Sequence, residues 1–143
     1  TDSSRRFGID HWRADIMEHS GTGRLLRRDP DGAVRTVLDG LQFANGVAIA
    51  PDGSWVVVAQ TGAYRLDRVW LTGDRAGLRE DFVTDLPAFP DNISSGDDGL
   101  VWVSMASARK PALDMTAGKP VLRNAKLTAE RPGRVLYGPG KAR

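Results

Sequence analysis

The feature that most constrains the fold is an internal repeat with an offset of 46 residues. The segment 45–57, NGVAIAPDGSWVV, aligns without gaps on the segment 91–103, DNISSGDDGLVWV. Each copy places an Asp-Gly pair between two short runs of β-branched and aromatic residues. This spacing predicts a β-hairpin, because glycine accepts the positive φ that a tight turn requires. The second runs, Trp55 to Ala59 and Leu100 to Met105, are so apolar that we expect both of their faces to be covered.

The strands of one repeat add up to a propeller blade. Two further β-like runs, Tyr64 to Leu71 and Leu78 to Val83, lie between the copies. Four strands in 46 residues are typical of a blade and not of a helical solenoid. An earlier hairpin, Gly23 to Arg28 followed by Ala33 to Leu38, has the same pattern. Residues 1–107 then amount to about two and a half blades, whereas propellers close with about four to eight. We therefore expect an all-β fold, an incomplete β-propeller with four-stranded antiparallel blades.

The composition fits one soluble domain. The chain has 143 residues, 41% of them hydrophobic, and a net charge of +2. It has no cysteine, which excludes disulfides and thiolate metal sites and leaves the cellular compartment open. We expect no membrane span, since no run approaches about 18 apolar residues. One segment, Phe7 to Ser20, departs from the β pattern and predicts a short helix of about two turns.

The positive charge lies at the C-terminal end. Residues 108–143 carry nine Lys and Arg against two acidic residues, and residues 1–107 carry eleven basic and sixteen acidic residues. We therefore expect a partial propeller at 1–107 and a basic tail at 108–143, with one further strand at Gly133 to Tyr137. Tyr137 is the tail's single aromatic residue and four prolines interrupt it, which argues against a nucleic-acid partner.

Oxygen-bearing side chains precede the first strand of each repeat. Asn45 aligns with Asp91, and Asn92 follows directly. Because the innermost strands of a propeller begin near its central channel, we expect these side chains to converge. A hard cation such as calcium takes six to eight oxygen ligands, so the pattern favours a metal site. The alternative is that Asn and Asp only cap the turns that start the strands.

The other polar residues are weaker candidates for a functional site. His11 and His19 lie eight residues apart, which is not a helical ligand spacing, and we expect them on the surface. Ser3 and Ser4 have no histidine partner at a fixed spacing, and Asp2 is either a channel-facing acid or a strand-end residue. No catalytic acid or base is identified. The tryptophans of the β runs are expected to pack in the core or between blades: Trp55, Trp70 and Trp102.

Several spaced motifs resemble the strictosidine-synthase-like branch of the six-bladed propeller superfamily, which also holds the paraoxonases, the gluconolactonases and the adipocyte plasma membrane-associated protein. The motifs are FANGVAIAPDG at 43–53, VWLTG at 69–73, FPDNI at 89–93 and TDSSRRF at 1–7. The resemblance covers about residues 1–107 and is not expected to continue beyond them.

The resemblance implies a six-bladed propeller with calcium in its channel. In the paraoxonase-like members the calcium is held by Asn and Asp at positions matching Asn45, Asp91 and Asn92. Those members hydrolyse lactones and aryl esters, and the metal polarises the carbonyl. True strictosidine synthases condense an amine with an aldehyde, tend to lose these ligand positions, and use a glutamate of a late blade.

The expected function is therefore that of part of a calcium-dependent lactone or aryl-ester hydrolase with a small-molecule substrate. The alternatives are a strictosidine-synthase-like condensing enzyme and a non-catalytic remnant that serves as a binding or assembly module. The family's remaining calcium ligands belong to blades that would precede Thr1, so we expect the isolated chain to be inactive. Self-association that closes the ring is a further expectation, because open blades expose strand edges.

Overall fold

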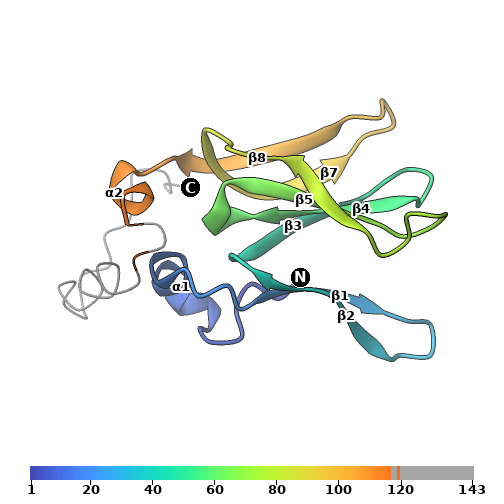
Figure 1. Cartoon of the computed structure of the whole chain (residues 1–143), viewed down its shortest axis with the longest axis horizontal. Helices are drawn as coiled ribbons and strands as arrows, with labels where there is room; N and C mark the ends of the chain where they lie inside the picture. The colour runs from blue at the N-terminus through green and yellow to red at the C-terminus, as the bar shows by residue number, and fades with distance from the viewer. Residues whose placement is uncertain (117–118, 120–143) are drawn as a thin grey trace, which may run out of the picture.

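Antiparallel β-strands make up most of the regular secondary structure in the computed structural model, which describes residues 1–116 and residue 119 (Figure 1). The strands are β1 (Gly23–Arg28), β2 (Val34–Leu41), β3 (Ala44–Ile49), β4 (Trp55–Gln60), β5 (Arg65–Trp70), β6 (Arg79–Val83), β7 (Ala88–Ser95) and β8 (Val101–Ala108). The helical elements are the 3₁₀ helices η1 (Ile9–His11) and η2 (Thr61–Ala63) and the α-helices α1 (Trp12–Glu18) and α2 (Pro111–Asp114). The predicted all-β class is confirmed, and so is the helical insertion, formed by η1 and α1.

The strands form three sheets, of which the middle one is a complete blade. It has the order β3-β4-β5-β6, and the sheets on either side pair β1 with β2 and β7 with β8. An isolated antiparallel bridge joins Asp2 to Arg24 at the edge of the first sheet. Gln60 pairs with Arg65 at the equivalent place in the middle sheet. The first described residues therefore lie within a blade, as the repeat predicts.

The observed strands follow the predicted ones closely, and β2 and β8 differ most. Each continues three residues past its predicted end, β2 to Leu41 and β8 to Ala108. Leu41 is fully buried in a cluster with Leu25 and Val58, so the apolar contact extends the strand beneath the middle sheet. The structure of the predicted strand at Gly133 to Tyr137 lies outside the described residues.

β4 and β8 differ in burial, although the sequence predicts that both faces of each strand are covered. Every residue of β4 after Trp55 is buried, so the predicted coverage of both faces is confirmed there. On β8 the prediction is wrong, because Trp102 is 60% exposed and Met105 is 41% exposed. Among the described residues, no further sheet lies across β8, and a strand is buried only by what packs on it. That a second copy of the chain associates with this one stays a prediction.

The two other tryptophans lie within the middle blade. Trp55 packs against Phe82, with their ring centroids 5.7 Å apart, and belongs to the half-buried margin of the core. The guanidinium of Arg68 lies over Trp70, 4.7 Å from the ring centroid, and pairs with Glu80. These two tryptophans are packed as predicted, whereas Trp102 is not.

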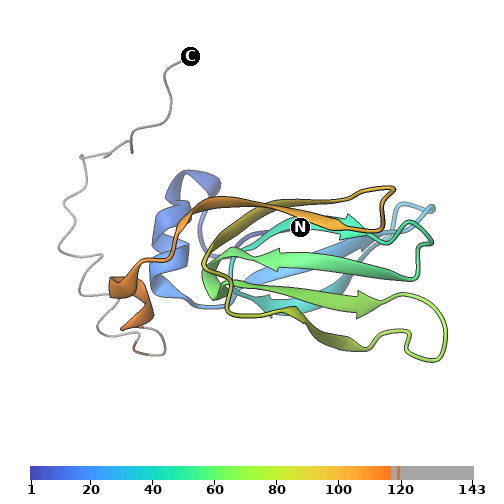
Figure 2. The same ribbon diagram turned by 90° about the horizontal axis from the view of Figure 1, so that it is seen from above.

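Both α-helices lie at the same end of the sheets, beyond the ends of the strands (Figure 2). A small apolar cluster joins them to the loops there, and its members are Ile16, Phe43, Tyr64, Phe89, Leu86 and Leu113. Arg109 continues this contact, because its guanidinium lies 4.3 Å from the Tyr64 ring centroid and pairs with Asp114. Residues 109–114 therefore pack on the propeller sheets. No helix among the described residues is long and apolar enough to cross a bilayer.

The middle blade contacts the third sheet through a glycine. A Cβ placed on Gly46 of β3 would lie 2.5 Å from the carbonyl oxygen of Asp91 on β7, and closer still to the backbone nitrogen of Ile93. A Cβ atom is essentially never found this close to a non-bonded heavy atom. Only glycine at this position lets the two backbones approach as they do.

We expect Gly46→Ala to lower the free energy of unfolding by about 1–3 kcal/mol, because the added methyl must push β7 away from β3. Urea denaturation followed by tryptophan fluorescence measures the change. Gly8→Ala is the matched control, since φ of Gly8 is −68° and nothing lies within 4 Å of its added Cβ. An unfolding free energy for Gly46→Ala equal to that of the control would show that the two sheets are not in close contact.

Candidate metal centre

The structure brings Asn45 and Asp91 together. Asn45 is the second residue of β3, Asp91 lies in the first half of β7, and both are half-buried. The side-chain amide nitrogen of Asn45, Nδ2, donates a hydrogen bond of 2.6 Å to Oδ1 of Asp91. The two residues come from adjacent sheets and from equivalent positions of the repeat. The predicted convergence of oxygen-bearing side chains is therefore seen for this pair.

A third residue, Thr61, holds the pair and was not singled out by the sequence. Its hydroxyl oxygen accepts a hydrogen bond of 3.1 Å from Asn45 Nδ2 and donates one of 2.6 Å to the carbonyl oxygen of Pro90. Thr61 is the first residue of η2, directly after β4. The hairpin register, in which Ala44 faces Gln60, is the signal that could have placed Thr61 beside Asn45.

Asn92 is placed differently from its neighbour. Its side chain is exposed and forms no hydrogen bond to another described residue, while its backbone carbonyl accepts a 3.0 Å bond from the Ser104 hydroxyl. It lines a shallow depression together with Trp102 and Val103. The structure therefore joins Asn45 to Asp91 but does not join Asn92 to either of them. The role of all three as metal ligands stays a prediction.

The chemistry of the Asn45–Asp91 pair fits part of a calcium shell. Both amide hydrogens of Asn45 are directed at acceptors, which leaves its carbonyl oxygen, Oδ1, outside these hydrogen bonds. Asp91 adds a second carboxylate oxygen and a negative charge. Hard oxygen donors of this kind suit calcium, which needs six to eight of them. Within residues 1–116 and 119, no group of three or more His, Cys, Asp or Glu could hold a metal.

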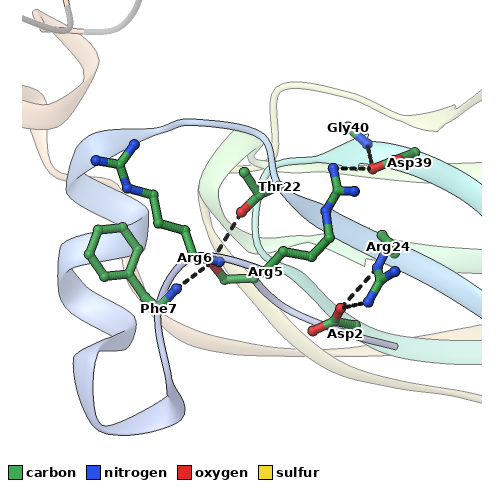
Figure 3. A network of polar contacts seen from close by, with 9 residues as sticks. Asp2, Arg5, Arg6, Phe7, Thr22, Arg24, Asp39 and Gly40 are labelled. Atoms are coloured by element: carbon green, nitrogen blue, oxygen red, sulfur yellow. Dashed lines mark hydrogen bonds and ion pairs between the residues drawn. The ribbon is translucent and has the colours of Figure 1, made fainter.

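Of the two roles predicted for Asp2, the structure shows that of a strand-end residue (Figure 3). Its carboxylate accepts two hydrogen bonds from the Arg24 guanidinium, of 2.9 and 2.5 Å, beside the backbone bridge between these residues. Ser4 is structural as well, since its hydroxyl accepts hydrogen bonds of 3.1 Å from the backbone nitrogens of Arg6 and Phe7. These contacts give the N-terminal segment its turn toward α1.

The two histidines lie at the ends of α1. His11 is exposed before the helix, as predicted. His19 ends the helix in a left-handed conformation with φ of 57° and is half-buried, not exposed as the predicted surface position implied. Asp15, on the inner side of α1, is only 4% exposed, and its Oδ1 has no hydrogen-bond partner among the described residues. Burial raises the pKa of this carboxyl; a hydrogen bond with Ser4 opposes the rise, and the charge of Glu18 adds to it.

We expect Asp15→Asn to stabilise the protein at pH 7. The folded-state pKa of Asp15 is raised above its unfolded value, so its charge costs stability at every pH above the folded pKa. The cost falls as the pH decreases through that pKa and disappears below the unfolded value of 3.8. Urea unfolding at pH 7 and at about pH 3.5 should therefore show a gain that vanishes at the lower pH. Asp10→Asn, at an exposed site, is the control.

Comparison with known proteins identifies the family. The family model described as strictosidine synthase matches residues 1–74 of this chain, from the N-terminal segment through β5 of the complete blade. The chain belongs to the strictosidine synthase family. The predicted strictosidine-synthase-like branch of the propeller proteins is thereby confirmed.

Its relatives include the Arabidopsis thaliana protein STRICTOSIDINE SYNTHASE-LIKE 13, which is 35% identical over 137 residues. The adipocyte plasma membrane-associated protein of Rattus norvegicus is 37% identical over 128 residues. The matches cover 95% and 86% of this chain and 34% of each relative. This member of the strictosidine synthase family therefore spans about a third of the length of the curated relatives it matches.

The similarity extends past residue 107, where we expected it to end. A match over 95% of 143 residues leaves about seven unmatched, so it includes most of the segment 108–143. The packing of Arg109 and Leu113 on the sheets agrees with a segment that belongs to the family fold.

Solved structures show the propeller fold for this family member. The calcium-binding protein regucalcin from Agrobacterium tumefaciens superposes with a TM-score of 0.52 at 23% identity, covering 62% of this chain and 31% of that one. A gluconolactonase from Xanthomonas campestris superposes with a TM-score of 0.50 at 26% identity, covering 57% and 28%. The described sheets are thus part of a propeller of the gluconolactonase-like kind.

Proposed function

We propose that this chain forms part of a calcium-dependent hydrolase of lactones or aryl esters, in which Asn45, Asp91 and Asn92 are calcium ligands. The observation that carries the proposal is the 2.6 Å contact between Asn45 and Asp91 across two adjacent sheets. It places an amide and a carboxylate side by side at equivalent positions of the repeat.

The chain's own residues would bind the ion. Asp91 supplies the negative charge, and the Asn45 carbonyl oxygen supplies a dipole. A calcium bound there would polarise the carbonyl of a lactone or ester and stabilise the oxyanion that develops on it. The three proposed ligand residues supply four side-chain oxygens at most, fewer than the six to eight that calcium requires, so we expect the 143 residues alone to bind the ion weakly and to hydrolyse nothing.

Two observations favour a hydrolase over the alternative functions. The likeness to the gluconolactonase from Xanthomonas campestris favours a lactone substrate. The presence of both Asn45 and Asp91 favours a metal-dependent reaction over the amine–aldehyde condensation of true strictosidine synthases, which use a glutamate. A non-catalytic binding module would need neither residue, nor the hydrogen bond between them.

We expect the chain to bind calcium with a dissociation constant on the order of 1 mM, the weak end of the range for protein sites. Asp91→Asn should weaken binding about tenfold or more, because it removes the charge while keeping the shape of the side chain. Isothermal titration calorimetry measures both constants. Asp97→Asn is the matched control, since Asp97 is exposed in the turn of the same hairpin and should bind as wild type does. Equal affinities for both variants would contradict the ligand assignment.

Catalysis is tested in a full-length propeller protein that contains this sequence. Hydrolysis of phenyl acetate and δ-valerolactone should disappear with EDTA and return with calcium. In Asp91→Ala we expect kcat/KM to fall about a hundredfold or more, since the oxyanion loses about 3 kcal/mol of stabilisation. Metal-independent condensation of an amine with an aldehyde would instead support the synthase alternative. The absence of both reactions would support the binding module.

A further inference from the structure

We propose that Thr61 is a positioning residue, whose hydroxyl fixes the orientation of the Asn45 side-chain amide so that its oxygen is presented to a cation. The proposal rests on the function proposed above and deepens it. Thr61 is in contact with both halves of the candidate site: it hydrogen-bonds Asn45 directly, and through the carbonyl oxygen of Pro90 it holds the residue that precedes Asp91.

The hydroxyl of Thr61 can donate only one hydrogen bond, and this determines which end of the Asn45 amide faces it. A threonine hydroxyl has one hydrogen, and the carbonyl oxygen of Pro90 can only accept. The hydrogen is therefore directed at Pro90, at 2.6 Å, and the hydroxyl presents a lone pair to Asn45. A lone pair requires an N–H donor, so Nδ2 and not Oδ1 of Asn45 must face Thr61.

The carboxylate of Asp91 imposes the same requirement from a second direction. An ionised carboxylate only accepts hydrogen bonds, and Oδ1 of Asp91 lies 2.6 Å from Asn45 Nδ2. The two hydrogens of the amide are thus divided between Thr61 and Asp91. The amide oxygen, the atom a hard cation binds, must then point away from both. With Asp91 alone the amide would keep one hydrogen bond and could rotate about it.

The position of Thr61 is itself fixed by the fold. Thr61 is 5% exposed, and its backbone nitrogen donates a 3.1 Å hydrogen bond to the carbonyl oxygen of Phe43. The preceding residue, Gln60, accepts a 2.8 Å bond from the backbone of Gln42 and donates a 2.6 Å bond to the fully buried Asp67. The hydroxyl is therefore held in place before any ion arrives, as a supporting residue of a binding site should be.

The test compares two substitutions at Thr61. Thr61→Val keeps the β-branched shape and removes the hydroxyl, and Thr61→Ser keeps the hydroxyl and removes the methyl. We expect Thr61→Val to weaken calcium binding about tenfold and Thr61→Ser to bind within about twofold of wild type, because one hydrogen bond that orients a ligand is worth about a factor of ten. Thr22→Val controls for the loss of a threonine hydroxyl, since Thr22 bonds Ser4 in the N-terminal segment.

A second measurement needs no metal. Nuclear magnetic resonance of the calcium-free chain reports hydrogen exchange at the Asn45 side-chain amide. We expect slow exchange in wild type, Thr61→Ser and Thr22→Val, and exchange at least about tenfold faster in Thr61→Val. Fast exchange in wild type, or no change in Thr61→Val, would overturn the positioning role.

The two readouts separate this inference from the proposed function. If wild type binds no calcium but Thr61→Val frees the Asn45 amide, the metal assignment fails and the positioning role stands. If wild type and Thr61→Val bind calcium equally, the positioning role fails and the metal assignment stands. Loss of binding in Thr61→Ser as well as in Thr61→Val would also contradict the inference, because the retained hydroxyl should orient Asn45.

Discussion

The close approach of β3 and β7 at Gly46 determines the arrangement of everything around the candidate site. A Cβ at this position would collide with the backbone of Asp91, so the absence of a side chain brings the two strands together. The side chain of Asn45, the residue before Gly46 in β3, is therefore within hydrogen-bond distance of the Asp91 side chain. Because glycine has no side chain, the equivalent strands of two neighbouring sheets can come into direct contact at this position.

A buried carboxylate supports this contact from within the middle blade. Asp67 of β5 is fully buried and accepts hydrogen bonds from Arg65 at 2.7 Å, from Arg79 at 3.0 Å and from Gln60 at 2.6 Å. A charge buried this deeply is tolerated because every partner is in place, and removing one arginine would leave it only partly compensated. Through Gln60 the same network fixes the start of η2 and therefore the hydroxyl of Thr61.

The structural features that the sequence predicted best are those that recur in the 46-residue repeat. The alignment of Asn45 on Asp91 gave the strands, the hairpin turns and the meeting of these two side chains, because equivalent positions of adjacent blades meet across a sheet interface. Thr61 escaped prediction, since it belongs to a 3₁₀ turn whose hydrogen bonds follow from the register of β3 and β4. Trp102 was predicted to be buried and is exposed, because burial depends on what lies across a strand and not on its own composition.

Anomalous diffraction from calcium-soaked crystals would show directly whether Asn45 and Asp91 together bind a calcium ion. We expect an anomalous peak in contact with Oδ1 of Asn45 and the carboxylate of Asp91, at the calcium–oxygen distances of about 2.3–2.6 Å seen in proteins. A calcium peak elsewhere on the chain, or no peak at this pair in crystals soaked well above the expected dissociation constant, would contradict the assignment of these two residues as ligands.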